Sequence, residues 1–152
     1  MYERILIPTD GSETAEAAID HAVTLANNCG SEIHALYVAN TQSITLTLGA
    51  EQVDRIRQGR FDEMPELREE AEAATGAVRE KAEAKGIDVT EHHSGGVPHK
   101  MITKYAEDND MDLIVIGSHG RSGVGKAILG SVAARTLRGT HIPTLVIDKR
   151  GA

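Results

Sequence analysis

The alternation of short apolar runs with helix-like segments constrains the fold of this chain more than any other sequence feature. The apolar runs, which are candidate strands, are Arg4–Pro8, Glu32–Ala39, Ile87–His92, Asp112–Ile116 and Pro143–Asp148. Between them, apolar residues recur three or four positions apart, as on one face of a helix. Because parallel neighbouring strands need a crossover, usually a helix, this order favours a sheet covered on both faces. The sequence therefore predicts an α/β fold: a single doubly wound, Rossmann-like domain with a five-stranded parallel sheet and helices on both faces.

Four segments have the features of helices. Ser12 suits the N-cap of the first helix, because its hydroxyl can accept an amide of the following turn. The second follows the apolar stripe from Leu67 to Ala82, and Pro98 suits the first turn of the third. The last would be lined by Ile128, Leu129, Val132, Thr136 and Leu137. Residues 40–65 carry no sustained period, so we expect a variable loop or lid there, within one domain that spans residues 1–152.

Composition limits the classes of partner. The chain has 16 Lys and Arg against 23 Asp and Glu, a net charge of −7, so nucleic acid is not an expected partner. No apolar run approaches the roughly 18 residues of a membrane span, and the N-terminal run is too short for a signal peptide. The single cysteine, Cys29, excludes an internal disulfide. These features predict a cytoplasmic protein that has no membrane partner.

Residues 120–127, GRSGVGKA, come close to the phosphate-binding loop G-x-x-x-x-G-K-[ST]. Ala127 stands where that loop needs a hydroxyl for Mg²⁺. Such enzymes also need a later strand with a metal-binding aspartate, and Asp148 is the only carboxylate downstream. The sequence therefore disfavours this loop. The three histidines His92, His93 and His99 lack the spacing of a known metal motif and are not expected to bind metal.

A wider pattern describes the glycines better. Gly117 and Gly120 are followed, after nine residues, by Gly130 and Ser131. This G-x2-G-x9-G-[ST] pattern resembles that of the universal stress protein family, in its nucleotide-binding type. Three further segments resemble the same family: MYERILIPTDGSE at the N-terminus, Gly96-Val97-Pro98 at the third helix, and IPTLVI near the C-terminus.

The resemblance implies an adenine-nucleotide site, with ATP as the ligand. It places Pro8 and Thr9 beside the base, and Asp10 at the ribose or at a bound Mg²⁺ or Mn²⁺. The backbone of Val38, at the end of the second strand, would pair with the edge of adenine. A carboxylate beside phosphates needs such a cation or a sugar hydroxyl as its partner.

The glycine loop would hold the phosphates. Gly117 and Gly120 lack side chains, so the backbone can approach the ligand closely. Amides near the start of the last helix would bind phosphate oxygens at the positive helix end. Arg121 can neutralise phosphate charge, whereas the role of His119 stays open between phosphate contact and solvent. Gly130, Ser131 and Val132 complete the predicted set.

The favoured function is that of an ATP-binding regulator or sensor in a stress response, with at most slow ATP hydrolysis, because no nucleophile–base pair is evident. Two alternatives remain: a dimeric interaction module without nucleotide, and an ATP-dependent transferase or ligase on the same fold. The apolar final segment, residues 143–148, is expected at a sheet edge. Both this edge and the resemblance imply a homodimer through that strand.

Overall fold

The strand order reverses at the centre of the sheet. The computed structural model describes residues 1–41, 49–61, 64–119 and 129–148. Its five strands are all parallel and lie in the order β3-β2-β1-β4-β5. Their bounds are β1 (Arg4–Pro8), β2 (Glu32–Asn40), β3 (Val89–Gly96), β4 (Leu113–Gly117) and β5 (Thr144–Ile147). The chain builds outward from β1 to β3 and then returns to β4 on the other side of β1. This confirms the predicted five-stranded parallel sheet.

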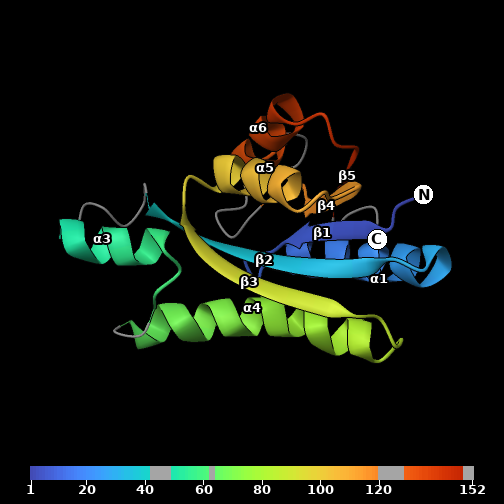
Figure 1. Cartoon of the computed structure of the whole chain (residues 1–152), viewed down its shortest axis with the longest axis horizontal. Coiled ribbons are helices and arrows are strands. Elements are labelled where there is room, and N and C mark those ends of the chain that lie inside the picture. Colours follow the sequence, from blue (N-terminus) through green and yellow to red (C-terminus); the bar gives the residue numbers. More distant parts are fainter. Residues whose placement is uncertain (42–48, 62–63, 120–128, 149–152) are drawn as a thin grey trace.

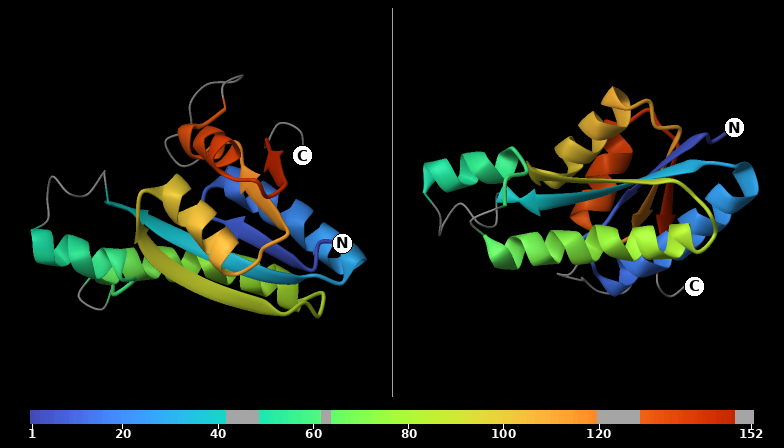
Figure 2. Two further views of the ribbon diagram at one scale, coloured as in Figure 1. Left: turned by 45° about the horizontal axis from the view of Figure 1, so that its top comes forward. Right: turned by 60° about the horizontal axis from the view of Figure 1, so that its bottom comes forward.

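Helices cover both faces of the sheet (Figure 1 and Figure 2). One face carries α1 (Glu13–Cys29) and α4 (Pro65–Glu83), and the other carries α5 (Pro98–Asp108) and α6 (Ser131–Gly139). Successive residues of a strand point to opposite faces, and here both faces are apolar. Accordingly Ile5 and Ile7 pack toward α1, whereas Leu6 packs toward α5, all at 0% exposure.

Two helices begin at the residues that the sequence predicts. The Ser12 hydroxyl accepts the amide of Ala15 at 3.2 Å and so caps the start of α1. Pro98 occupies the first turn of α5, where its missing amide removes no helical hydrogen bond. Both residues fix the places where the chain leaves the carboxyl edge of the sheet and enters a helix.

Three element predictions are wrong. Residues 40–65 are not irregular throughout: α3 (Ala50–Arg57) forms there, with Ile56 completely buried. β2 continues to Asn40, so Val38 does not end the strand. Leu129 precedes α6 and is 38% exposed instead of lining the helix, and Ile128 lies outside the described residues. Helix α3 could not be predicted from the sequence, because its eight residues are too few to show a clear helical period.

None of the helices in the described ranges has both the length and the apolar character needed to cross a membrane.

Replacing Thr136 with Val should stabilise the protein by about 1 kcal/mol, since a buried hydroxyl without a hydrogen bond carries a desolvation penalty. Thr136 in α6 is 0% exposed, and its Oγ1 has no hydrogen-bond partner within the described part of the chain. Urea denaturation would measure the free energy of unfolding. Thr75 is the matched control: it is equally buried, but its hydroxyl donates to Ala71 and contacts His93, so Thr75→Val should destabilise. A loss of stability in Thr136→Val would contradict this account.

Candidate functional site

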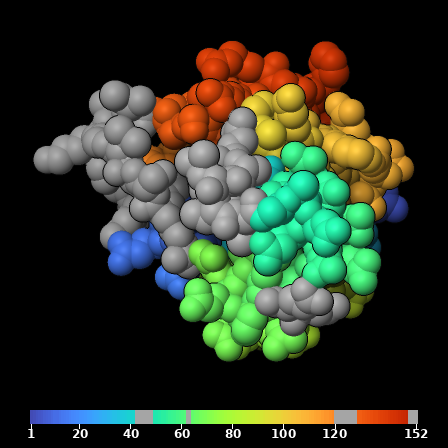
Figure 3. Space-filling view, turned by 90° about the vertical axis from the view of Figure 1, so that its left-hand side faces the viewer, coloured from blue at the N-terminus to red at the C-terminus, as the bar shows by residue number. Residues whose placement is uncertain are grey.

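The candidate site lies at the carboxyl edge of the sheet, between β1 and β4. These strands are neighbours, with Leu6 paired to Ile114, yet the connections from them lead to opposite sides of the sheet. In open parallel sheets, such a reversal point leaves a crevice in which ligands bind. Figure 3 looks onto the side of the molecule toward which β2 and β3 run, and α3 stands at the front of it. The predicted site residues on β1 and β4 emerge at this edge.

The turn after β1 is held by its own side chains. Asp10 Oδ1 accepts the amide of Ser12 at 2.9 Å, and Thr9 Oγ1 accepts the amide of Gly11 at 3.2 Å. Gly11 has φ +81°, a conformation that favours glycine. Thr9 is buried, and Pro8 is the last residue of β1. The turn therefore fixes the Asp10 carboxylate at the sheet edge before any ligand arrives.

The backbone of Val38 faces the same crevice. Even-numbered residues of β2 turn their amides and carbonyls toward β1: the Glu32 amide donates to the Glu3 carbonyl, and the Leu36 carbonyl accepts the Thr9 amide, at 2.9 Å each. Val38 is the next residue with this orientation. It lies beyond the Thr9–Leu36 bond, where the chain of β1 has already turned away.

Gly117, the last residue of β4, is in close contact with the first turn of α1. A Cβ atom at Gly117 would lie 3.0 Å from Thr14 Cγ2 and 3.1 Å from the Thr14 carbonyl carbon. A side chain at Gly117 would therefore require the first turn of α1 to move by a few tenths of an ångström. This contact brings the start of α1 against the end of β4, and so places the Asp10 turn close to the end of the neighbouring strand.

Gly130 closes the segment that follows β4. Its amide donates to the Ser118 carbonyl at 2.7 Å, and a Cβ atom at Gly130 would lie 2.7 Å from the same oxygen. Ser118 is itself fixed, because its amide donates to Ile147 of β5 at 2.8 Å. The two ends of the glycine-rich segment thus meet, and α6 begins directly beside the end of β4.

Among the residues that the structure describes, no side chain caps the N-terminus of α6. Gly130 is the N-cap residue, and Ser131 and Val132 form the start of the helix, as expected. The first amides of a helix have no partner within the helix, so they form a ready site for an anion. The structure thereby places Ser131 and Val132 at the same edge as Asp10. Of the other predicted residues, Gly120 and Arg121 lie outside the described part of the chain.

Sequence reasoning missed two residues of this site, Ser118 and Thr14. Ser118 is 5% exposed, and its Oγ lies 2.7 Å from Nδ1 of His119. This contact orients the imidazole of His119 at the end of β4. Ser118 stands next to Gly117 in the sequence, but nothing in the sequence singles out Thr14. Their roles depend on tertiary contacts that no spacing reveals.

The histidines do not form a cluster. His92 and His93 are successive strand residues and point to opposite faces: the His92 ring lies beside Tyr105, and His93 Nε2 lies 2.9 Å from Thr75 Oγ1. Burial lowers the pKa of His92, with a smaller effect from His93. Over the described ranges, no three His, Cys, Asp or Glu side chains gather closely enough to hold a metal ion.

His99, at the start of α5, also has a lowered pKa. Burial is the main cause, followed by the positive charges of Arg135 and Lys100. The neutral form of His99 is therefore favoured at pH 7. Its imidazole adds little positive charge at this end of α5.

Comparisons with known proteins agree with the family resemblance. The sequence profile of the universal stress protein family matches residues 1–148. Universal stress protein MJ0531 of Methanocaldococcus jannaschii is 35% identical over 150 residues, which cover 98% of this chain and 84% of the relative. Universal stress protein MJ0577 of the same organism is 31% identical over 159 residues, covering 100% of this chain and 98% of the relative.

Solved structures show the same fold. The structure of MJ0577 aligns with a TM-score of 0.78 at 30% identity, over 98% of this chain and 97% of that one. A universal stress protein in complex with cAMP aligns with a TM-score of 0.63 at 22% identity, over 97% of both chains. One from Archaeoglobus fulgidus in complex with dAMP gives 0.62 at 21%, over 96% of this chain and 98% of that one. By its sequence and its fold, the chain belongs to the universal stress protein family.

Proposed function

We propose that the chain binds ATP at the carboxyl edge between β1 and β4. One observation carries the proposal: three features come together where the strand order reverses. They are the start of α6, which no described side chain caps, the Asp10 turn, and the Val38 amide and carbonyl, which point to the β1 side of β2. These supply donors for phosphate, a carboxylate, and backbone groups for a base edge. The family relatives solved with cAMP and dAMP support an adenine nucleotide as the ligand.

Each part of the nucleotide has a counterpart in the site. Val38 would pair with the adenine edge, next to Pro8 and Thr9. The amides of Gly130, Ser131 and Val132 would bind phosphate oxygens, whose negative charge the helix dipole stabilises. Gly117 ends β4, and His119 follows two residues later with its imidazole beside Ser118. From the sequence, Gly120 and Arg121 are assigned to the phosphates as well.

A divalent cation fits the donor chemistry of Asp10. Mg²⁺ prefers oxygen ligands and is often held by one or two carboxylates together with substrate phosphates. Asp10 would hold Mg²⁺ or Mn²⁺ in this way, and the ion would neutralise charge on the phosphates. Asp10 also suits a hydrogen bond from a ribose hydroxyl.

The site favours binding over fast turnover. Among the described residues at the end of β4, Ser118 and His119 form a hydroxyl–imidazole pair, and Ser118 is 5% exposed with its Oγ directed to the imidazole. A buried hydroxyl in that position is not presented to a phosphate. We therefore propose a nucleotide-dependent regulator in a stress response, with at most slow ATP hydrolysis.

Calorimetric titration tests the proposal. ATP, ADP, AMP and GTP would each be titrated, with and without Mg²⁺ or Mn²⁺, into protein first freed of any nucleotide carried through purification. We expect ATP to bind more tightly than GTP, and the cation to strengthen ATP binding. If the emptied protein binds none of the four nucleotides, the proposal is wrong, and the alternative of a dimeric interaction module without nucleotide gains support.

Asp10→Asn should remove most of the cation dependence of ATP binding. Asparagine keeps a side-chain oxygen for the Ser12 amide, so the turn is retained while the negative charge is lost. We expect the strengthening of ATP binding by Mg²⁺ to shrink about tenfold, which corresponds to ~1.4 kcal/mol. The same titrations measure this effect. An undiminished Mg²⁺ effect in Asp10→Asn would show that the ion is held elsewhere.

We also propose that two copies of the chain pair through β5. The sheet has two edge strands, β3 and β5. The edge strand β3 carries the exposed Glu91, which pairs with Arg79, and charge on an edge discourages pairing. By contrast, β5 exposes Leu145 at 37%. An apolar edge invites a second copy to extend the sheet.

A further inference from the structure

The carboxyl ends of β2 and β3 extend beyond the end of β1 as a pair of strands. Past the Thr9–Leu36 hydrogen bond, β2 has no further pairing with β1 in the described chain. Residues 38–40 of β2 pair with residues 94–96 of β3, in the register Val38↔Ser94. We call these two segments the ribbon. Two strands alone are marginally stable in water, so the ribbon needs support from another element.

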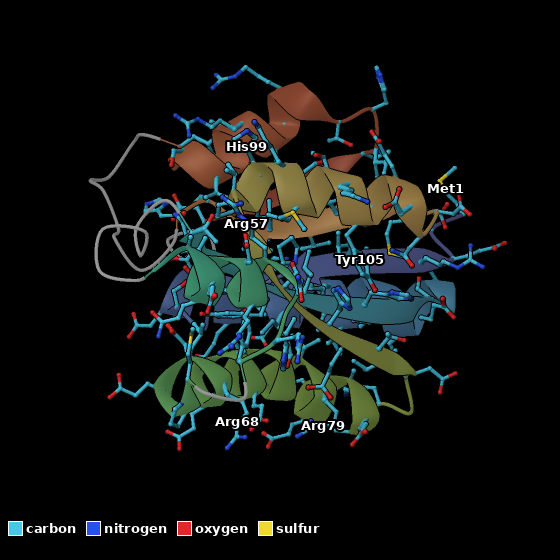
Figure 4. The ribbon with its side chains drawn as sticks, turned by 60° about the vertical axis from the view of Figure 1, so that its left-hand side comes forward. Met1, Arg57, Arg68, Arg79, His99 and Tyr105 are labelled. Carbon is cyan, nitrogen blue, oxygen red and sulfur yellow. The ribbon has the colours of Figure 1, made fainter. Side chains whose placement is uncertain are left out.

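That support comes from residues 49–61, which we call the α3 arm. Ile56 of the arm is 0% exposed and belongs to the same buried cluster as Ala39 of the ribbon. A Cβ atom at Gly95 would lie only 2.3 Å from the Ile56 carbonyl oxygen. The arm therefore sits directly on the ribbon, at a position where β3 has no side chain. Figure 4, with Arg57 labelled on α3, shows the arm beside the end of β3.

A ring cluster holds the far end of the arm. Phe61 is 3% exposed and stacks on His93 of β3, with ring centroids 6.2 Å apart and planes at 12°. Tyr37 of β2 meets Phe61 edge-on at 6.4 Å. Because the Thr75 hydroxyl donates to Ala71, it accepts from His93 Nε2 at 2.9 Å and fixes that ring. The arm is thus attached to both β2 and β3, at the residues directly before the ribbon begins.

We infer that the α3 arm is a positioning element for base recognition, and that its docking and base binding are coupled. The inference rests on the proposed ATP site. Val38 lies on the ribbon, so the place of its amide and carbonyl depends on whatever holds the ribbon. A base paired to Val38 and an arm seated on Gly95 stabilise the same two short segments. By linkage, each must then strengthen the other.

The first test is Gly95→Ala, which places a methyl group against the Ile56 backbone and leaves the strand conformation ordinary. We expect ATP affinity to fall about tenfold and the preference for ATP over GTP to shrink. Inorganic tripolyphosphate, which has no base, should bind as tightly as it does to the wild type. Gly76→Ala is the matched control, because it adds the same methyl group outside the arm, in α4, where the nearest described atom is a guanidinium nitrogen of the Arg79 side chain at 3.4 Å.

Limited trypsin digestion reports the arm directly, since Arg55, Arg57 and Arg60 all lie within it. Gly95→Ala should accelerate cleavage at these sites, and ATP should slow it in the wild type. Ile56→Ala serves as a second variant if Gly95→Ala does not fold, because it loosens the same contact without a backbone clash. It should reproduce both the faster cleavage and the weaker ATP binding.

The outcomes separate this inference from the function on which it rests. Faster cleavage of the arm with unchanged ATP affinity and base preference overturns the coupling and leaves the ATP site intact. Unchanged cleavage in both variants shows that Gly95 and Ile56 do not hold the arm, and it also overturns the inference. If the wild type binds no nucleotide, the proposed function is wrong and the coupling falls with it.

Discussion

Gly130→Ala is expected to weaken ATP binding about a hundredfold, the largest effect on binding among the substitutions considered. The added Cβ atom would lie 2.7 Å from the Ser118 carbonyl oxygen and 3.1 Å from His119 Cα, so the two chain segments must separate. Separation breaks the Gly130–Ser118 hydrogen bond and moves the first turn of α6. Hydrogen bonds to a charged group contribute about 1.5–3 kcal/mol each, and losing one or two of them gives this loss of affinity.

Two further variants are needed to interpret the ATP affinity of Gly130→Ala. Ser131→Ala removes one hydroxyl while the helix start stays in place, and we expect it to weaken ATP binding by less than Gly130→Ala does. Gly76→Ala adds a methyl group in α4, where it meets only the Arg79 side chain among the described residues, and should bind ATP normally. Circular dichroism and thermal unfolding of each variant would show whether the fold is kept. A folded Gly130→Ala protein with wild-type ATP affinity would contradict the assignment of phosphate to the start of α6.

Leu145→Lys is expected to convert the dimer to a monomer. Leu145 is 37% exposed on the edge strand β5, and a charge on an edge opposes pairing with a second copy. Its neighbour Val146 is a poorer choice, because it packs with the core between the sheet and the helices α5 and α6. A charge at Val146 would disturb the fold as well as the edge. Sedimentation velocity measures the result.

Leu129→Lys is the matched control for the edge experiment. Leu129 is 38% exposed, almost the same as Leu145, but it precedes α6 and lies on no strand. We expect this variant to sediment as the wild type does. A wild-type protein that is monomeric at micromolar concentration would contradict the proposed dimer. So would a Leu145→Lys protein that remains dimeric.

Most of the fold was predictable because each buried strand is a compact apolar run and each long helix shows its period. The exceptions have physical causes. Helix α3 is short, and the burial of Ile56 depends on contact with Gly95, nearly forty positions later in the chain. Gly95 and Gly96 look like turn residues in the sequence, yet they belong to β3, where they pair with Ala39 and Asn40 of β2.

The candidate site was predictable in its outline. Two sequence features predicted that these residues lie at one edge of the sheet: the spacing of Gly117, Gly130 and Ser131, and the position of Asp10 after an apolar strand. The structure places all four residues there. The sequence did not reveal which residues crowd the glycines at two of these positions. Gly117 contacts Thr14 and Gly130 contacts Ser118, and both contacts form only when the chain is folded.

The central place of β1 has a consequence for how the protein is made. β1 pairs on one side with β2, and on the other with β4, so that the Arg4 amide meets Asp112 across 108 positions of sequence. During synthesis β1, β2 and β3 precede β4, so the proposed phosphate site is incomplete until β4 and the start of α6 have emerged. Contacts of such long range also slow folding. If the chain binds nucleotide as proposed, binding therefore has to wait until β4 and the start of α6 have been made and have packed against β1.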